Sequence, residues 1–255
     1  MSKQYLFWGT FNTENVTFAM GPDKAGKPSI NMLVQPNCTG VAFVTPACVT
    51  NWPRLTGDGN FGTMWGPTDA NKAKFTLDLT DSEINGSAND NYAKFATILN
   101  NIDDKLLDFV HNNQLRLLGR KNLTREEVAM LQIRTVRPKY DKVSGQPLGN
   151  SIQATTAKYG WDGLGGRVER RINICDRHGK VIPDGTVAPG DVVAATIYAN
   201  QVYTGVGGDK FGIHWSMEDV SVVCQRSKLD TKTSVPAFAA HQYEFGHDYE
   251  AMAVC

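Results

Sequence analysis

The fold is decided by the stretch Arg167–Val223, which reads RVERRINICDRHGKVIPDGTVAPGDVVAATIYANQVYTGVGGDKFGIHWSMEDVSVV. A first strand is expected over Arg167–Asp176, where apolar and polar residues alternate and Arg170 interrupts the apolar face. Further strands are expected over Val192–Tyr203 and Phe211–Val223, with turns rich in glycine and proline between the runs. Alternation with a period of two, bounded by turn residues, predicts half-buried antiparallel strands.

These strands need partners, because an isolated meander leaves its edges open. Five other runs read as strands: Ser29–Gln35, Val41–Val49, Lys74–Leu79, Gln132–Tyr140 and Gln153–Trp161. Pro46 confines the second of these to an edge or ends it there, since proline cannot donate to a sheet. The chain is therefore expected to be mainly β.

A helical insertion over about residues 90–131 separates two groups of strands. Within Asn91–Asn112, apolar residues recur at helical spacing, and Asp90 precedes them as a cap. The run Thr124–Leu131 opens with Thr-Arg-Glu-Glu, which has the form of a capping box and predicts a second, short helix.

The composition narrows the class of protein. The chain has 255 residues and a formal net charge of zero. This charge argues against a strongly basic nucleic-acid coat protein, but it does not exclude a basic surface on one part of the molecule. Its five cysteines form no CxxC pair, so a reducing intracellular setting is expected rather than a disulfide framework. Neither a secretory signal nor an apolar run long enough to span a membrane is evident.

The motifs of common enzymes are missing from the sequence. No HExxH motif or His-Cys cluster predicts a metal site, and no GxSxG motif predicts a nucleophile elbow. The glycine cluster Gly205–Gly208 leads into a strand rather than a helix, so a dinucleotide or phosphate loop is not expected. We therefore predict no catalytic residues, no metal and no cofactor.

Basic residues interleaved with aromatic ones are the remaining chemical signal. Such mixtures bind single-stranded nucleic acid, because cations neutralise phosphates while bases stack on rings. An aromatic residue considered alone is more often part of the core. Here, however, three groups of interleaved basic and aromatic residues occur in one chain. The predicted nucleic-acid-binding residues are Trp52, Arg54, Phe61, Trp65, Lys72, Lys74, Arg134, Arg137, Lys139, Tyr140, Tyr159, Trp161, Arg167, Arg170 and Arg171.

The sequence resembles the OB-fold single-stranded-DNA-binding proteins of large nucleocytoplasmic DNA viruses and their relatives in short-tailed phages. The resemblance rests on the order of elements and on stretches such as Val44–Gly59, Phe95–Val110, Pro189–Ile197 and Gly212–Val223. It implies a partly open Greek-key barrel of five strands with a helical insertion. It also implies binding of single-stranded DNA without sequence specificity during viral DNA replication, recombination and repair.

The resemblance also implies an organisation and a set of partners. We expect an N-terminal segment over residues 1–28, an OB-fold-like domain over 29–226 and a C-terminal tail over 227–255. In the phage members an acidic tail contacts replication proteins; here the tail is only mildly acidic and ends in Cys255. We expect the negative charge of carboxylates in the tail and the helical insertion to offset the positive charge of a basic groove. The expected location is the host nucleus or a cytoplasmic viral replication site, away from membranes, and a homo-oligomer stays open.

Two other readings of the sequence stay open. A structural or virion β-protein without affinity for nucleic acid would use the same aromatic residues in its core or at subunit interfaces. An enzyme with an unfamiliar site is the third reading, although no motif supports it. Salt-dependent binding of an oligonucleotide would distinguish a single-stranded-DNA-binding protein from both of these alternatives.

Overall fold

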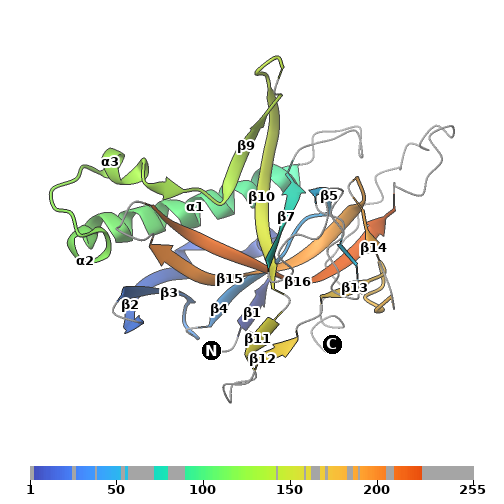
Figure 1. Ribbon diagram of the computed structural model, residues 1–255, viewed down its shortest axis with the longest axis horizontal. Helices are drawn as coiled ribbons and strands as arrows, with labels where there is room; N and C mark the ends of the chain where they lie inside the picture. The colour runs from blue at the N-terminus through green and yellow to red at the C-terminus, as the bar shows by residue number, and fades with distance from the viewer. Residues whose placement is uncertain are drawn as a thin grey trace.

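The computed structural model describes residues 3–24, 27–37, 39–52, 55–56, 72–79, 90–141, 143–157, 159–161, 167–169, 172–182, 186–188, 190–204 and 210–225. Strands predominate, and the helices lie between the strands β7 and β8 (Figure 1). The strands before the helices are β1 (Lys3–Leu6), β2 (Val16–Lys24), β3 (Lys27–Val34), β4 (Gly40–Val44), β5 (Cys48–Trp52), β6 (Leu55–Thr56) and β7 (Lys72–Asp78).

The helices and the later strands complete the described chain. The helices are α1 (Asp90–Asn112), α2 (Gln114–Leu118) and α3 (Arg125–Ala129), and two short 3-10 turns lie at Trp8–Thr10 and Thr13–Asn15. The later strands are β8 (Gln132–Ile133), β9 (Val136–Tyr140), β10 (Pro147–Ala157), β11 (Tyr159–Trp161), β12 (Arg167–Glu169), β13 (Asn173–Cys175), β14 (Thr186–Val187), β15 (Val192–Thr204) and β16 (Phe211–Cys224).

Five strands close into a barrel. The hydrogen-bonded neighbours run β5–β7–β10–β16–β15, and β15 pairs with β5 to complete the ring. Counted along the chain, this is the order first, second, third, fifth, fourth. The third and fifth strands are parallel at Thr155 and Ser216, and the other four pairings are antiparallel. The expected mainly β, OB-fold-like Greek-key barrel with a helical insertion is confirmed.

The strands outside the ring extend the same sheet. β1 pairs in parallel with β4, and β2 pairs with β3, which reaches β15 at Ile30. Residues 3–24 are thus hydrogen-bonded, through β4 and β3, into the sheet that contains the barrel. The division of the chain at residues 28 and 226 stays a prediction.

Parts of the opening stretch differ from expectation. The single strand expected over Arg167–Asp176 is wrong: β12 pairs with β11 in a small separate hairpin, while β13 runs parallel to β16. The runs Val41–Val49, Gln132–Tyr140 and Gln153–Trp161 are likewise each divided into two strands. The β15–β16 pairing follows the alternating pattern, with buried Val202 opposite buried Ile213.

The helix α1 packs its apolar stripe against the barrel and the N-terminal turns. Phe95, Leu99 and Ile102 are fully buried, and burying such a side chain stabilises the fold by about 1.5–3 kcal/mol. The Phe95 ring meets Trp8 and Phe43 edge to face, with centroids 6.2 and 5.9 Å away. α1 thus shares one core with the sheet.

The predicted capping box of the second helix is confirmed in α3. The hydroxyl of Thr124 accepts from the backbone N–H of Glu127, and the Glu127 carboxylate accepts from the backbone N–H of Thr124. Two N–H groups that the first turn leaves unpaired are satisfied in this way. Val128, buried in this helix, packs in the common core.

Candidate nucleic-acid interface

The barrel strands β5 and β7 carry three of the predicted nucleic-acid-binding residues, Trp52, Lys72 and Lys74. Lys74 is directly opposite Thr155, and Lys72 is opposite Ala157. On the other side of β7, Trp52 of β5 is opposite Thr76. Candidates from two separate sequence groups, Trp52 and Lys72/Lys74, therefore meet on adjacent strands.

The hairpin formed by β9 and β10 carries the next group and projects from the barrel (Figure 1). The Arg137 side chain is exposed, and its Nη1 donates to Oε1 of Gln153 on β10 at 2.8 Å. Gln153 is itself opposite Thr76 on β7. Tyr140, near the end of the hairpin, is 58% exposed and is accessible to a stacking partner. The Arg137 side chain therefore lies on the same face of the sheet as Gln153 and Thr76.

Two basic residues of this group are ion-paired with carboxylates of the protein. The Lys139 Nζ lies 2.6 Å from Oδ2 of Asp78, the last residue of β7, and that carboxylate is largely buried. The Arg134 Nη1 lies 2.7 Å from Oδ1 of Asp104 on α1, in a half-exposed pair. A phosphate that binds Lys139 or Arg134 would have to compete with a carboxylate of the protein for the cation.

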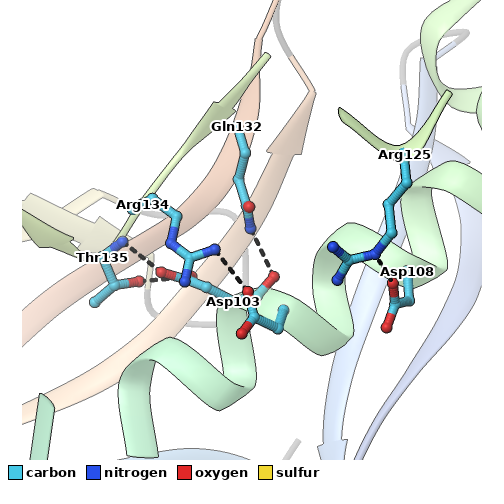
Figure 2. Close-up of polar contacts among 7 residues, drawn as sticks. Asp103, Asp108, Arg125, Gln132, Arg134 and Thr135 are labelled. Atoms are coloured by element: carbon cyan, nitrogen blue, oxygen red, sulfur yellow. Dashed lines mark hydrogen bonds and ion pairs between the residues drawn. The ribbon is translucent and has the colours of Figure 1, made fainter. Parts of the chain in front are cut away.

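A buried carboxylate joins α1 to the start of β9 (Figure 2). Asp103 is fully buried; its Oδ2 accepts from the Thr135 backbone N–H at 2.6 Å, and its Oδ1 accepts from the Thr135 hydroxyl at 2.9 Å. The same hydroxyl accepts from the Trp215 indole N–H of β16 at 3.0 Å. Gln132 Nε2 also donates to the Asp103 backbone carbonyl at 2.6 Å. The segment that carries Arg134 is thus held between the helix and the barrel.

Burial raises the pKa of Asp103 from 3.8 to about 6, because desolvation disfavours the charged form. The two hydrogen bonds from Thr135 and the charge of Arg134 oppose this shift, while the charge of Asp104 adds to it. Asp103 occupies a position of the apolar stripe of α1, four residues after Leu99 and three before Leu106. An acidic residue at a stripe position was the signal that could have identified it from the sequence.

The remaining predicted residues fall in two groups. Tyr159, Trp161 and Arg167 belong to the β11–β12 hairpin, where Trp161 is directly opposite Arg167. Arg54, Phe61, Trp65, Arg170 and Arg171 lie outside the residues that the structure describes. Their predicted roles, like those of the other candidates, stay predictions.

Comparison with known proteins gives a likeness in structure only. No protein family model matches the sequence, and no curated protein matches it. The crystal structure of gp2.5, a single-stranded DNA binding protein of bacteriophage T7, has a TM-score of 0.49 at 8% identity, covering 76% of this chain and 98% of that one. The C-terminally truncated single-stranded DNA-binding protein of bacteriophage Enc34 has a TM-score of 0.39 at 12% identity, covering 81% and 95%. The same phage protein in complex with single-stranded DNA has a TM-score of 0.35 at 13% identity, covering 81% and 96%.

Other kinds of site find little support among the described residues. Within them, His, Cys, Asp and Glu side chains form no group of three that could hold a metal ion. None of the helices in the described part of the chain is long and apolar enough to cross a membrane.

Sequence reasoning did not select Tyr203. Tyr203 is half-buried on β15 opposite Gly212, and partial burial raises the pKa of its phenol while the nearby charge of Arg137 opposes the shift. A Cβ at Gly212 would lie 2.7 Å from the Ile133 carbonyl oxygen and 3.0 Å from the Tyr203 hydroxyl. A glycine inside a strand pattern can indicate such a close approach of backbones.

A turn between β13 and β14 carries three exposed basic residues that were not among the predicted site residues. Arg177, His178 and Lys180 are all exposed on this turn, and the Asp176 carboxylate accepts from the backbone N–H groups of His178 and Lys180. These hydrogen bonds lower the pKa of Asp176 and fix the shape of the turn. The clustering of basic residues in RHGK was the available signal.

Proposed function

We propose that the protein binds single-stranded DNA, without sequence specificity, across the outer face of β7, β10 and β9. The observation that carries the proposal is the alignment of basic positions on adjacent strands: Lys72 and Lys74 on β7, and Arg137 and Lys139 on β9, with β10 between them. β7 and β10 are the second and third strands of the barrel. In OB folds the face of these two strands is the one that binds oligonucleotides.

The chemistry of the proposed face suits a flexible strand. Cations spaced along neighbouring strands can follow the phosphates, whereas exposed aromatic rings can stack on bases at about 1–3 kcal/mol per base. Every base offers a π-face, so stacking favours no particular sequence. The segment between the first two barrel strands contains Arg54, Phe61 and Trp65, and the corresponding loop of OB folds also contacts oligonucleotides.

A fluorescence anisotropy titration with labelled oligo-dT tests the proposal. We expect saturable binding at about 50 mM salt that weakens at about 200 mM, because each neutralised phosphate of a single strand contributes about −0.7 to the slope of log K against log salt. Four engaged cations give a slope of about −3. Absence of binding at low salt, or binding indifferent to salt, would refute the proposal. An oligo-dA of the same length controls for sequence preference.

The cellular role belongs to the same proposal. Replication, recombination and repair each expose single-stranded DNA, and the resemblance described above implies a part in these processes for a viral protein. A contact between tail residues 227–255 and replication proteins is likewise proposed from the resemblance. Kinship with the proteins of large nucleocytoplasmic DNA viruses stays a prediction.

A further inference from the structure

Two ion pairs lie one turn apart on α1 and have the same nitrogen-to-oxygen distance. Asp104 pairs with Arg134 through Oδ1 and Nη1 at 2.7 Å, and Asp108 pairs with Arg125 through Oδ1 and Nε at 2.7 Å. The carboxylate side chains are 47% and 56% exposed, and the guanidinium side chains are 39% and 48% exposed. Only the first pair includes a predicted nucleic-acid-binding residue, Arg134, which lies two residues before β9.

The backbone beside Arg134 is fixed, so its ion pair is not an incidental contact of a loose segment. Thr135 donates two hydrogen bonds to the buried Asp103 carboxylate, and Arg137 Nε donates to the Arg134 carbonyl oxygen at 3.4 Å. Arg134 can therefore leave Asp104 only by rotating its side chain. Once it has rotated, the guanidinium remains beside the start of β9 and is available to another anion.

A second ion pair joins a predicted nucleic-acid-binding cation of β9 to a carboxylate of β7. Lys139 and Asp78 are 2.6 Å apart, and Asp78 belongs to β7. Two of the predicted nucleic-acid-binding cations between residues 134 and 140 are thus held by carboxylates of the protein itself. Asp104 is the more exposed of the two carboxylates and is the one that solvent or a ligand can reach.

We propose that Asp104 limits the affinity of the protein for DNA by acting as an internal competitor: a DNA phosphate replaces the Asp104 carboxylate on Arg134. The inference rests on the proposed function. The exchange breaks one ion pair and forms another. Arg134 therefore contributes less to the free energy of DNA binding than an unpaired cation would. The released carboxylate attracts a counterion from solution, which offsets part of the counterion release from DNA and flattens the dependence on salt.

The test compares Asp104→Asn with Asp108→Asn in the full chain, by anisotropy titration with labelled oligo-dT at pH 7.5. Both variants remove one negative charge from the same helix, so their general effect on the charge of the protein is equal. We expect Asp104→Asn to bind about two- to five-fold more tightly than Asp108→Asn, which is the range that corresponds to an exposed ion pair. Its salt slope should also be steeper than that of Asp108→Asn.

Arg134→Ala provides the second arm. In the Arg134→Ala protein the Asp104 carboxylate has no arginine to pair with. Adding Asp104→Asn or Asp108→Asn to this protein should therefore give the same affinity for oligo-dT. Equal binding of the two Asn variants in the otherwise wild-type protein would overturn the inference while leaving the proposed function intact. An advantage of Asp104→Asn that persists without Arg134 would also overturn it. Failure of the wild-type protein to bind oligo-dT at low salt would overturn the proposed function and the inference together.

Discussion

The buried carboxylate of Asp103 makes the stability of the protein depend on pH in a direction that can be calculated. Its pKa is raised from 3.8 to about 6, so the folded protein holds this proton more tightly than the unfolded chain does. Protonation therefore stabilises the fold. The stabilisation is fully present below about pH 4 and is lost as the pH rises through about 6.

The size of the effect follows from the shift. At about 1.4 kcal/mol per pKa unit, a shift from 3.8 to about 6 corresponds to about 3 kcal/mol of unfolding free energy. The substitution Asp103→Asn removes the titration and keeps the shape of the side chain. We expect the free energy of unfolding of the variant, relative to that of the wild type, to rise by about 3 kcal/mol between pH 4 and pH 7.

Urea denaturation followed by circular dichroism at half-unit steps from pH 4 to pH 7.5 measures this difference. Other carboxylates titrate too: hydrogen bonds lower the pKa of Asp141 and Asp176, which adds a pH dependence of opposite sign. These contributions are common to both proteins and cancel in the difference. Asp108→Asn, at an exposed position of the same helix, controls for the general effect of removing one carboxylate. Parallel profiles for Asp103→Asn and the wild type would refute the reasoning.

Three further predictions concern the interface and the core. Arg137→Ala should weaken oligo-dT binding and reduce the salt slope by about 0.7, whereas Arg125→Ala, on the helical insertion, should leave both unchanged; equal effects would contradict the placement of the interface. Phe95→Ala should lower the free energy of unfolding by about 3–5 kcal/mol in urea denaturation, because the ring is fully buried; a loss under 1 kcal/mol would contradict that packing. Gly212→Ala should cost about 1–3 kcal/mol in the same assay, since the new Cβ would crowd the Ile133 carbonyl oxygen, and a neutral result would contradict this close approach.

Local patterns in the sequence predicted the elements that depend on local physics. The apolar spacing within Asn91–Asn112 predicted α1, and the Thr124–Glu127 pattern predicted the cap of α3, because both depend on neighbours within one or two turns. Alternation predicted β15 and β16 for the same reason.

Strand pairing was harder to predict, because it depends on residues far apart in the chain. Alternation in Arg167–Asp176 is compatible with one strand, yet its two halves pair with different strands, β11 and β16. The ion pairs of Arg134 and Lys139 were missed for the same reason. Their partners Asp104 and Asp78 are 30 and 61 positions away, and no local pattern identifies them.

The helical insertion has a consequence for the order in which the protein folds. β7 and β10 are neighbours in the barrel, but the insertion separates them in the chain, and closing such a long loop slows the formation of a sheet. A helix the length of α1 forms within about a microsecond and then spans about 35 Å as a rigid rod. We expect the contacts of α1 to form first and to shorten the flexible chain that separates the two strands. Folding would then proceed from the middle of the polypeptide outward, with closure of the barrel as its last step.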